Sequence, residues 1–256
     1  MSEDAILLEK KGKVATITFN RPGRMNAFNL DFGRGLFAAL EDVAADRDIR
    51  TLILTGANEH FCSGADMHLL HEGTKSPERL IMMKDLARII LAIRKLPQPV
   101  VAKVRGVAYG VGINLALSSD FVIAADTARF CEVFVQIGVM MDGGGTYFLP
   151  RLVGLVKARE LALLGEEIDG TTAASIGLIY KSVPEDDLDE EVRLLAHKLS
   201  EKSLHSLAII KESLESSFDM TLAQALEFEA SHQSILLQTE EHKESVEKFL
   251  RLRDKL

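Results

Sequence analysis

Two short stretches of small residues, 63–66 (SGAD) and 106–112 (GVAYGVG), each follow an apolar run with the character of a strand. Small residues let a backbone approach a ligand closely, so that amide N–H groups can face it. Two such amides aimed at one oxygen form an oxyanion hole, which suits the enolate of a thioester. Each stretch taken alone could equally be a structural turn, because glycine-rich pairs are common in turns.

One carboxylate, Asp142, precedes three glycines and a helical pattern over residues 147–152. Its side chain could cap that helix by accepting a backbone N–H. Alternatively, the apolar neighbours Phe134, Met140 and Met141 could desolvate the carboxylate, raise its pKa and make it a better base. We favour the catalytic interpretation and keep the cap as its alternative.

The overall composition is that of an ordinary globular protein, with 256 residues of which 47% are hydrophobic and 27% are charged. This length suits one large domain or a core with an appendage. The net charge of −8, without a basic stripe, argues against binding to nucleic acid.

The cysteines and the apolar runs indicate the compartment. Cys62 and Cys131 form no CxxC pair or even framework, which indicates a reducing environment. The first residues, MSEDAILLEKKGK, lack the apolar centre of a signal peptide. No apolar run reaches the roughly 18–20 residues of a membrane span. We therefore expect a cytoplasmic protein that does not associate with a membrane.

Strand and helix signals alternate along most of the chain. The predicted strands are 6–8, 14–19, 51–55, 100–104 and 121–124, with helices between them, one capped by Asn29 and one ending before Pro97. This alternation predicts an α/β protein. After about Leu188 only helical patterns remain, over 188–200, 204–217, 222–237 and 240–252. We expect a core over residues 1–200 and a helical region over 201–256 that packs against a neighbouring subunit.

Four segments, 14–28, 51–67, 99–125 and 138–154, together resemble the crotonase, or enoyl-CoA hydratase/isomerase, superfamily in order and spacing. The resemblance covers nearly the whole chain. It implies a crotonase-like spiral of ββα units with a helical C-terminal trimerisation region. It also implies an acyl-CoA thioester substrate, a homotrimer or dimer of trimers, and no cofactor, since coenzyme A is part of the substrate.

The resemblance assigns the two small-residue stretches to the oxyanion hole. The first amide of the family's hole belongs to the alanine of a GAD motif, which here is Ala65. The second belongs to the middle residue of a GGG-like run, which here is Gly110-Val111-Gly112, so Val111 takes that place. The valine side chain matters little if only its N–H is used.

Three more residues match positions that contact coenzyme A in the family. Arg24 lies where a basic residue meets a phosphate of coenzyme A, although a solvated surface arginine is the alternative. Asp66 and Met67 would line the passage of the pantetheine and adenine groups, mainly through their backbone.

The chain departs from the family's hydratases at both catalytic glutamates. Asn114 and Phe134 occupy those two positions, and neither side chain exchanges a proton near neutral pH. Reversible hydration needs one group to activate water and another to protonate carbon. Asn114 could instead orient the substrate or bond the start of the helix. Family isomerases of the epoxyphenylacetyl-CoA type carry an aspartate at the position of Asp142.

These features favour migration of a double bond in an enoyl-CoA, with Asp142 as base and then acid. One alternative is a hydratase, or another lyase or hydrolase, with altered residues. Another is a dehalogenase-like enzyme, in which the aspartate attacks carbon, but Ala87 stands where that enzyme has a histidine. The last is a non-catalytic acyl-CoA-binding protein.

Other polar residues carry less weight. Glu132 would share a strand face with Phe134, and we favour a structural or solvated role for it. His60, His68 and His71 lack the fixed spacing of metal ligands, so we expect no metal. Residues 68–78 and the helix after them are expected to shape the acyl pocket.

Overall fold

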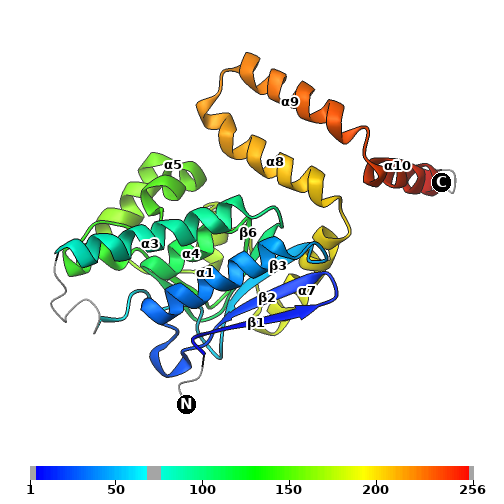
Figure 1. The fold of residues 1–256 in the computed structure, drawn as a ribbon. Coiled ribbons are helices and arrows are strands. Elements are labelled where there is room, and N and C mark those ends of the chain that lie inside the picture. The colour runs from blue at the N-terminus through cyan, green and yellow to red at the C-terminus, as the bar shows by residue number, and fades with distance from the viewer. Residues whose placement is uncertain (1–3, 68–75, 254–256) are drawn as a thin grey trace.

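The chain alternates strands and helices up to residue 200 and is helical beyond it (Figure 1). A computed structural model describes residues 4–67 and 76–253. A six-stranded sheet has the order β1-β2-β3-β4-β6-β9. Its strands are β1 (Ile6–Lys11), β2 (Val14–Phe19), β3 (Thr51–Gly56), β4 (Val100–Val104), β6 (Phe121–Ala125) and β9 (Lys181–Val183).

β1 and β2 form an antiparallel hairpin, and every later pairing in this sheet is parallel. A smaller sheet joins β5 and β7 in parallel and adds β8 antiparallel to β7. Its strands are β5 (Val107–Tyr109), β7 (Arg129–Cys131) and β8 (Ile168–Asp169). Parallel strands require crossover segments, and the helices supply them.

The helices of the first 200 residues are held by local capping and by burial. The Asn29 side chain accepts the Phe32 N–H at 2.9 Å and so begins the first helix, as predicted. These helices are α1 (Leu30–Ala45), α3 (Ser76–Lys95), α4 (Val111–Leu117), α5 (Gly145–Leu164), α6 (Gly170–Ser175) and α7 (Leu188–Ser200). Short 3₁₀ turns are η1 (Pro22–Arg24), η2 (Val133–Ile137) and η3 (Glu185–Asp187).

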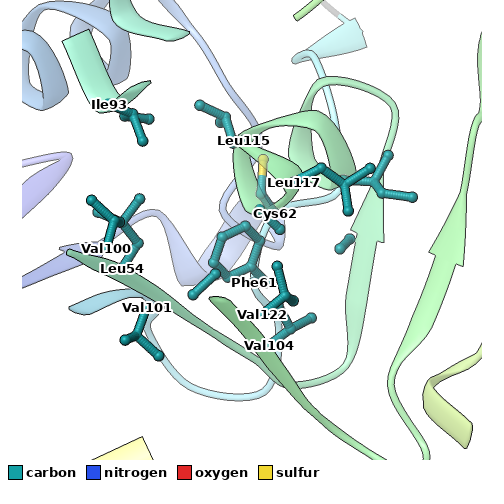
Figure 2. Close-up of a cluster of buried hydrophobic side chains, with 14 of the residues drawn as sticks. Leu54, Phe61, Cys62, Ile93, Val100, Val101, Val104, Leu115, Leu117 and Val122 are labelled. Atoms are coloured by element: carbon teal, nitrogen blue, oxygen red, sulfur yellow. The ribbon is translucent and has the colours of Figure 1, made fainter. Parts of the chain in front are cut away.

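The hydrophobic core lies between the large sheet and the helices that cover it. Figure 2 shows Phe61 and Cys62 among apolar side chains from β3, β4, β6, α3 and α4. Both residues are completely buried and belong to the single core cluster of the described chain. The loop after β3 is therefore anchored in the core immediately before Ser63, which fixes the start of the SGAD stretch.

The last three helices project away from the core (Figure 1). They are α8 (Leu204–Ser216), α9 (Leu222–Leu236) and α10 (Glu240–Arg253), with η4 (Ser217–Asp219) between the first two. Thr221 and Gln224 form the capping box of α9. Neither α8 nor α9 contains a buried residue, although several large apolar side chains lie on them or next to them. These exposed side chains include Leu214, Phe218, Leu222, Leu226 and Ile235.

The α/β architecture and the helical C-terminus are confirmed, with α7 spanning the predicted residues 188–200. The continuation of a strand through Phe134 is wrong, because β7 ends at Cys131 and the chain turns into η2. The division of the chain into a core over 1–200 and an oligomerisation region over 201–256 stays a prediction. Among the described helices, none combines the length and apolarity needed to cross a membrane.

Candidate active site

The two small-residue stretches lie directly against each other. The Cys62 N–H donates to the Val107 carbonyl and the Tyr109 N–H donates to the Cys62 carbonyl, both at 3.0 Å. A Cβ on Gly112 would stand 2.2 Å from the Cys62 carbonyl oxygen. Only glycine allows this approach, so backbone contact sets the distance between the two loops.

Ala65 sits in a short parallel bridge with Phe28. The two bonds of that bridge run from the Phe28 N–H to the Gly64 carbonyl and from the Asp66 N–H to the Phe28 carbonyl, at 2.8 and 2.9 Å. In such a pairing the bonds use the neighbours of the bridged residue. The Ala65 N–H therefore points to the side opposite Phe28.

Val111 is the first residue of α4, where a backbone N–H has no acceptor within the helix. Gly110 precedes it with φ 52° and ψ −122°, a conformation that favours glycine. The Gly110 N–H donates to the Cys131 carbonyl at 2.9 Å, which ties the loop to β7. The Val111 amide is thus directed out of α4 at a fixed point beside the first loop.

Asp142 lies between η2 and α5, and its carboxylate does not cap α5. The N-cap of α5 is Gly144, and the Asp142 backbone carbonyl accepts the Gly145 N–H at 3.1 Å. The alternative of a side-chain cap is therefore wrong. Burial raises the pKa of Asp142 from 3.8 to about 6, and its Oδ1 is buried without a hydrogen-bond partner among the described residues.

Glu132, at the junction of β7 and η2, is only 2% exposed. Burial is the main cause that raises its pKa to about 8, and the Asp142 charge adds to it, while a bond from Asn114 opposes it. Of the structural or solvated role expected for Glu132, the solvated alternative is wrong, and the structural alternative stays open. Strand alternation missed its position because the chain leaves the strand there. A lone acid within the apolar run 130–135 was the available signal.

Asn114 connects these two acids and is completely buried. Its Nδ2 donates to the Asp142 carbonyl at 2.9 Å and lies 3.4 Å from Glu132 Oε2. A Cβ on Gly145 would stand 2.8 Å from that nitrogen, so the amide fits against bare backbone. We call Asn114, Glu132 and Asp142 the Asn114 cluster. Phe134 is also buried, and its ring lies 3.6 Å from the Cβ position of Gly110.

The residues expected at the coenzyme A passage surround the first loop. The Ser63 hydroxyl donates to the Arg24 carbonyl at 3.4 Å, and Arg24 itself is exposed. Asp66 is different, because its carboxylate pairs with Arg21 at 2.9 Å and its side chain is only 12% exposed. Its side chain thus holds the loop, and the expectation that its backbone lines the coenzyme A passage stays a prediction. Met67 is exposed on the same loop.

Of the three histidines, the structure describes only His60. His60 Nδ1 accepts the Val107 N–H at 3.4 Å and so belongs to the contact between the loops. His68 and His71 lie outside the described residues, as does most of the predicted pocket segment 68–78. In the part of the chain that the structure describes, no cluster of three or more His, Cys, Asp or Glu side chains could hold a metal ion.

Backbone amides from two contacting loops lie beside buried carboxyl groups, an arrangement that could stabilise an oxyanion. The sequence model of the enoyl-CoA hydratase/isomerase family matches residues 9–255, and the chain belongs to this family. The resemblance to the crotonase superfamily and the corresponding fold are thereby confirmed. The chain is an enzyme of this family, and an acyl-CoA substrate is consistent with that membership.

The similar proteins include one named an isomerase and others named hydratases. The 1,2-epoxyphenylacetyl-CoA isomerase of Escherichia coli (strain K12) is 35% identical over 248 residues, which cover 96% of this chain and 95% of that one. A probable enoyl-CoA hydratase of Rhodobacter capsulatus is 37% identical over 255 residues, covering 99% and 97%. The crystal structure of an enoyl-CoA hydratase from Polaromonas sp. JS666 superposes with a TM-score of 0.91 at 31% identity, covering 96% of each chain.

Proposed function

We propose that this enzyme is an enoyl-CoA isomerase, which moves the double bond of a 3-enoyl-CoA into position 2. The observation that carries the proposal is the Asp142 carboxylate, which is largely buried, has no capping role and has a pKa raised toward neutrality. The positions that hold glutamates in the family's hydratases are Asn114 and Phe134, which offer no titratable group.

The reaction needs a base, an oxyanion hole and a returning acid. The Asp142 carboxylate removes a proton from C2, the electron pair of that C–H bond forms a C1=C2 bond, and the carbonyl π pair moves onto the thioester oxygen. The N–H groups of Ala65 and Val111 donate to this oxygen and stabilise the dienolate. When the C=O bond re-forms, the C1=C2 pair becomes the C2=C3 double bond, and the C3=C4 pair takes a proton from Asp142 at C4. C2 and C4 are separated by one carbon, so a single carboxylate can serve both.

The other residues of the two loops position the substrate in this proposal. Arg24 binds a phosphate of coenzyme A, and the backbone of Asp66 and Met67 lines the passage for the pantetheine and adenine groups. The position of Arg24 beside Ser63 and the exposure of Met67 support these roles. Gly110, Asn114 and Phe134 border the acyl end, which their packing around the second loop supports.

The second candidate is a hydratase that uses Glu132 and Asp142 as its two proton-transferring groups. The buried second carboxyl favours it, as does the likeness to a probable enoyl-CoA hydratase. A panel of 2-enoyl-, 3-enoyl- and 3-hydroxyacyl-CoA thioesters separates the candidates by mass. Conversion of the 3-enoyl thioester at constant mass is expected. Uptake of water by the 2-enoyl thioester as the main reaction would establish the hydratase instead.

We also propose that the helical region 201–256 holds the enzyme as a homotrimer or a dimer of trimers. Its support is the exposure of large apolar side chains on or beside α8–α10, including Leu214, Phe218, Leu222 and Phe249. An uncovered apolar surface of this kind marks an interaction site. Light scattering should give three or six times the 28.2 kDa chain mass, and a monomer would contradict the proposal.

A further inference from the structure

The Asn114 cluster contains more acceptors than donors. Asn114 Oδ1, Glu132 Oε1 and Asp142 Oδ1 are all buried, and none has a partner among the described residues. Buried polar atoms are nearly always paired, so three orphaned oxygens in one cluster need an explanation. A carboxyl group that carries a proton is itself a donor, which makes a neutral acid the simplest remedy within the cluster.

Glu132 is the acid whose surroundings disfavour its charge. The titratable groups that act with it are Asp142, from the segment before α5, and the adjacent thiol of Cys131. Burial raises the pKa of that thiol to about 11, so it stays neutral. No lysine or arginine in the described chain contributes to the charge balance at Glu132. A buried carboxyl beside a second carboxylate and without a cation holds its proton.

Asn114 places both acids at the same loop. It stands three residues after Val111 in α4, and its Nδ2 lies within 3.4 Å of Glu132 Oε2 and 2.9 Å from the Asp142 carbonyl. Glu132 also follows Cys131, whose carbonyl accepts the Gly110 N–H. Glu132 and the Asp142 backbone therefore both contact Asn114 in the helix that begins with Val111, and the Asp142 carboxylate is close enough for its charge to act on Glu132.

We propose that Glu132 is a second proton-carrying group of this site, which enters each turnover as a neutral acid and protonates C4 while Asp142 holds the proton removed from C2. This inference rests on the proposed isomerase function. In the isomerase reaction proposed above, Asp142 makes both proton transfers and the buried Glu132 has no role.

The proton balance closes within the two acids. The C2–H bond breaks, its proton goes to Asp142, and its electron pair is stored in the dienolate. The O–H bond of Glu132 then breaks, its proton bonds to C4 through the C3=C4 electron pair while C2=C3 and the thioester C=O form, and Glu132 is left as a carboxylate. Transfer of the proton from Asp142 to Glu132 restores the starting state, with no oxidant or reductant.

The coupling of the two acids favours this order. While Asp142 is ionised, its charge helps Glu132 to keep its proton. Once Asp142 has taken the C2 proton it is neutral, and that like-charge effect disappears. Glu132 thus becomes a stronger acid at the step in which C4 requires a proton.

Deuterium labelling combined with Glu132→Gln tests the proposal. A 3-enoyl-CoA with two deuterium atoms at C2 is converted in H₂O in a single turnover, and C4 of the product is analysed by NMR. Wild type is expected to place solvent-derived hydrogen at C4. Glu132→Gln, which keeps the shape of the neutral acid, is expected to return deuterium from Asp142 to C4 and to lower kcat about 100-fold or more. Deuterium at C4 in wild type, or a labelling pattern that the substitution leaves unchanged, overturns the proposal.

An infrared measurement without substrate provides an independent check. Wild type at about pH 7 should show a protonated carboxyl C=O band that is absent in Glu132→Gln, with circular dichroism confirming that the variant folds. Absence of that difference also overturns the proposal, whatever the activity. Different results would contradict the proposed isomerase function itself, namely full activity of Asp142→Asn or no conversion of any 3-enoyl-CoA.

Discussion

Two buried polar clusters in this chain are built in opposite ways. The Lys211 cluster joins α8 to the core, and its ammonium group meets Asp120 at 2.6 Å and the carbonyls of Leu96 and Gln98 at 2.9 Å. Its three donors thus have three acceptors. The Asn114 cluster holds two acids without a cation, and three of its oxygens lack partners among the described residues.

The charge-balanced Lys211 cluster is suited to stabilising the fold, whereas the unpaired acids of the Asn114 cluster are suited to a reaction. Asp120 also lies 3.8 Å from Arg94, and Arg94 pairs with Glu215 of α8, so charges of both signs balance in the Lys211 cluster. Such pairing of opposite charges stabilises one arrangement of the chain. Unpaired buried acids cost stability, and perturbed pKa values of this kind concentrate at functional sites.

The largest effect on the reaction is expected for Asp142→Asn. Loss of the base should lower kcat about 100- to 10,000-fold, measured with a 3-enoyl-CoA substrate. The same variant should be more stable above about pH 6, by an amount on the order of 2 kcal/mol in urea unfolding, because asparagine resembles the favoured neutral acid. A variant that loses activity and stability together would make Asp142 a structural residue like Asp120.

The second prediction concerns the amide of Val111. Proline is tolerated at the first position of a helix, so Val111→Pro removes this N–H and leaves α4 in place. We expect kcat to fall about 100- to 1,000-fold, which is typical for loss of one oxyanion donor. Val111→Ala keeps the N–H and is the matched control. Equal kcat values for the two variants would exclude this amide from the oxyanion hole.

The third prediction is a variant that loses stability and keeps its activity, the opposite of Asp142→Asn. Lys211→Met leaves the Asp120 carboxylate buried with an incomplete set of partners, and should lower the free energy of unfolding by about 3 kcal/mol. Because the Lys211 cluster takes no part in the reaction, kcat per folded enzyme should be unchanged. Urea unfolding and steady-state kinetics on the same sample check both statements, and a selective fall in kcat would contradict them.

The smallest expected effect is the dependence of kcat/KM and of stability on pH, which comes from the Asn114 cluster and not from the Lys211 cluster. Asp142 acts as a base when ionised, so kcat/KM should rise with pH up to about pH 6, and with Glu132 as the neutral acid it should fall again above about pH 8. The raised pKa of Asp142 has the opposite effect on stability, which is greatest below pH 3.8 and falls as pH rises to about 6. Glu132, whose pKa is raised from 4.5 to about 8, adds a slope of the same sign that extends to higher pH. Asp142→Asn should therefore remove only the Asp142 part of the slope, between pH 3.8 and about pH 6, whereas Lys211→Met should retain the whole of it. An unchanged slope in Asp142→Asn would assign this part to another group.

Local signals predicted much of the fold. Asn29 capped α1 as expected because its side chain needs only the N–H of Phe32, three residues on. The helices after Leu188 were found by their periodicity, which requires no knowledge of distant contacts. The closeness of the two small-residue loops was inferred only from the resemblance, because their bridge depends on pairing between Cys62 and Ala108.

In the Asn114 cluster, local sequence patterns did not predict where the side chains lie. Asp142 has a residue type that suits a cap, yet Gly144 occupies the N-cap and the carboxylate does not bond there. The two-residue alternation of a strand predicted the side on which Glu132 lies, but the strand ends at Cys131. Its burial depends on segments 18 and 10 residues away, those of Asn114 and Asp142, which a pattern of neighbouring residues does not encode.

The fit of Asn114 against bare backbone has a consequence for how this enzyme could change its reaction. A Cβ on Gly143 would lie 3.0 Å from the Asn114 Cβ, and one on Gly145 would lie 2.8 Å from its amide nitrogen. A glutamate in place of Asn114 would need room for one more methylene and would add a third acid where no cation balances it. Glutamates at both 114 and 134, the positions of the acids in the family's hydratases, would therefore need a further change at Glu132 or Asp142, because these two buried acids already lack a cation.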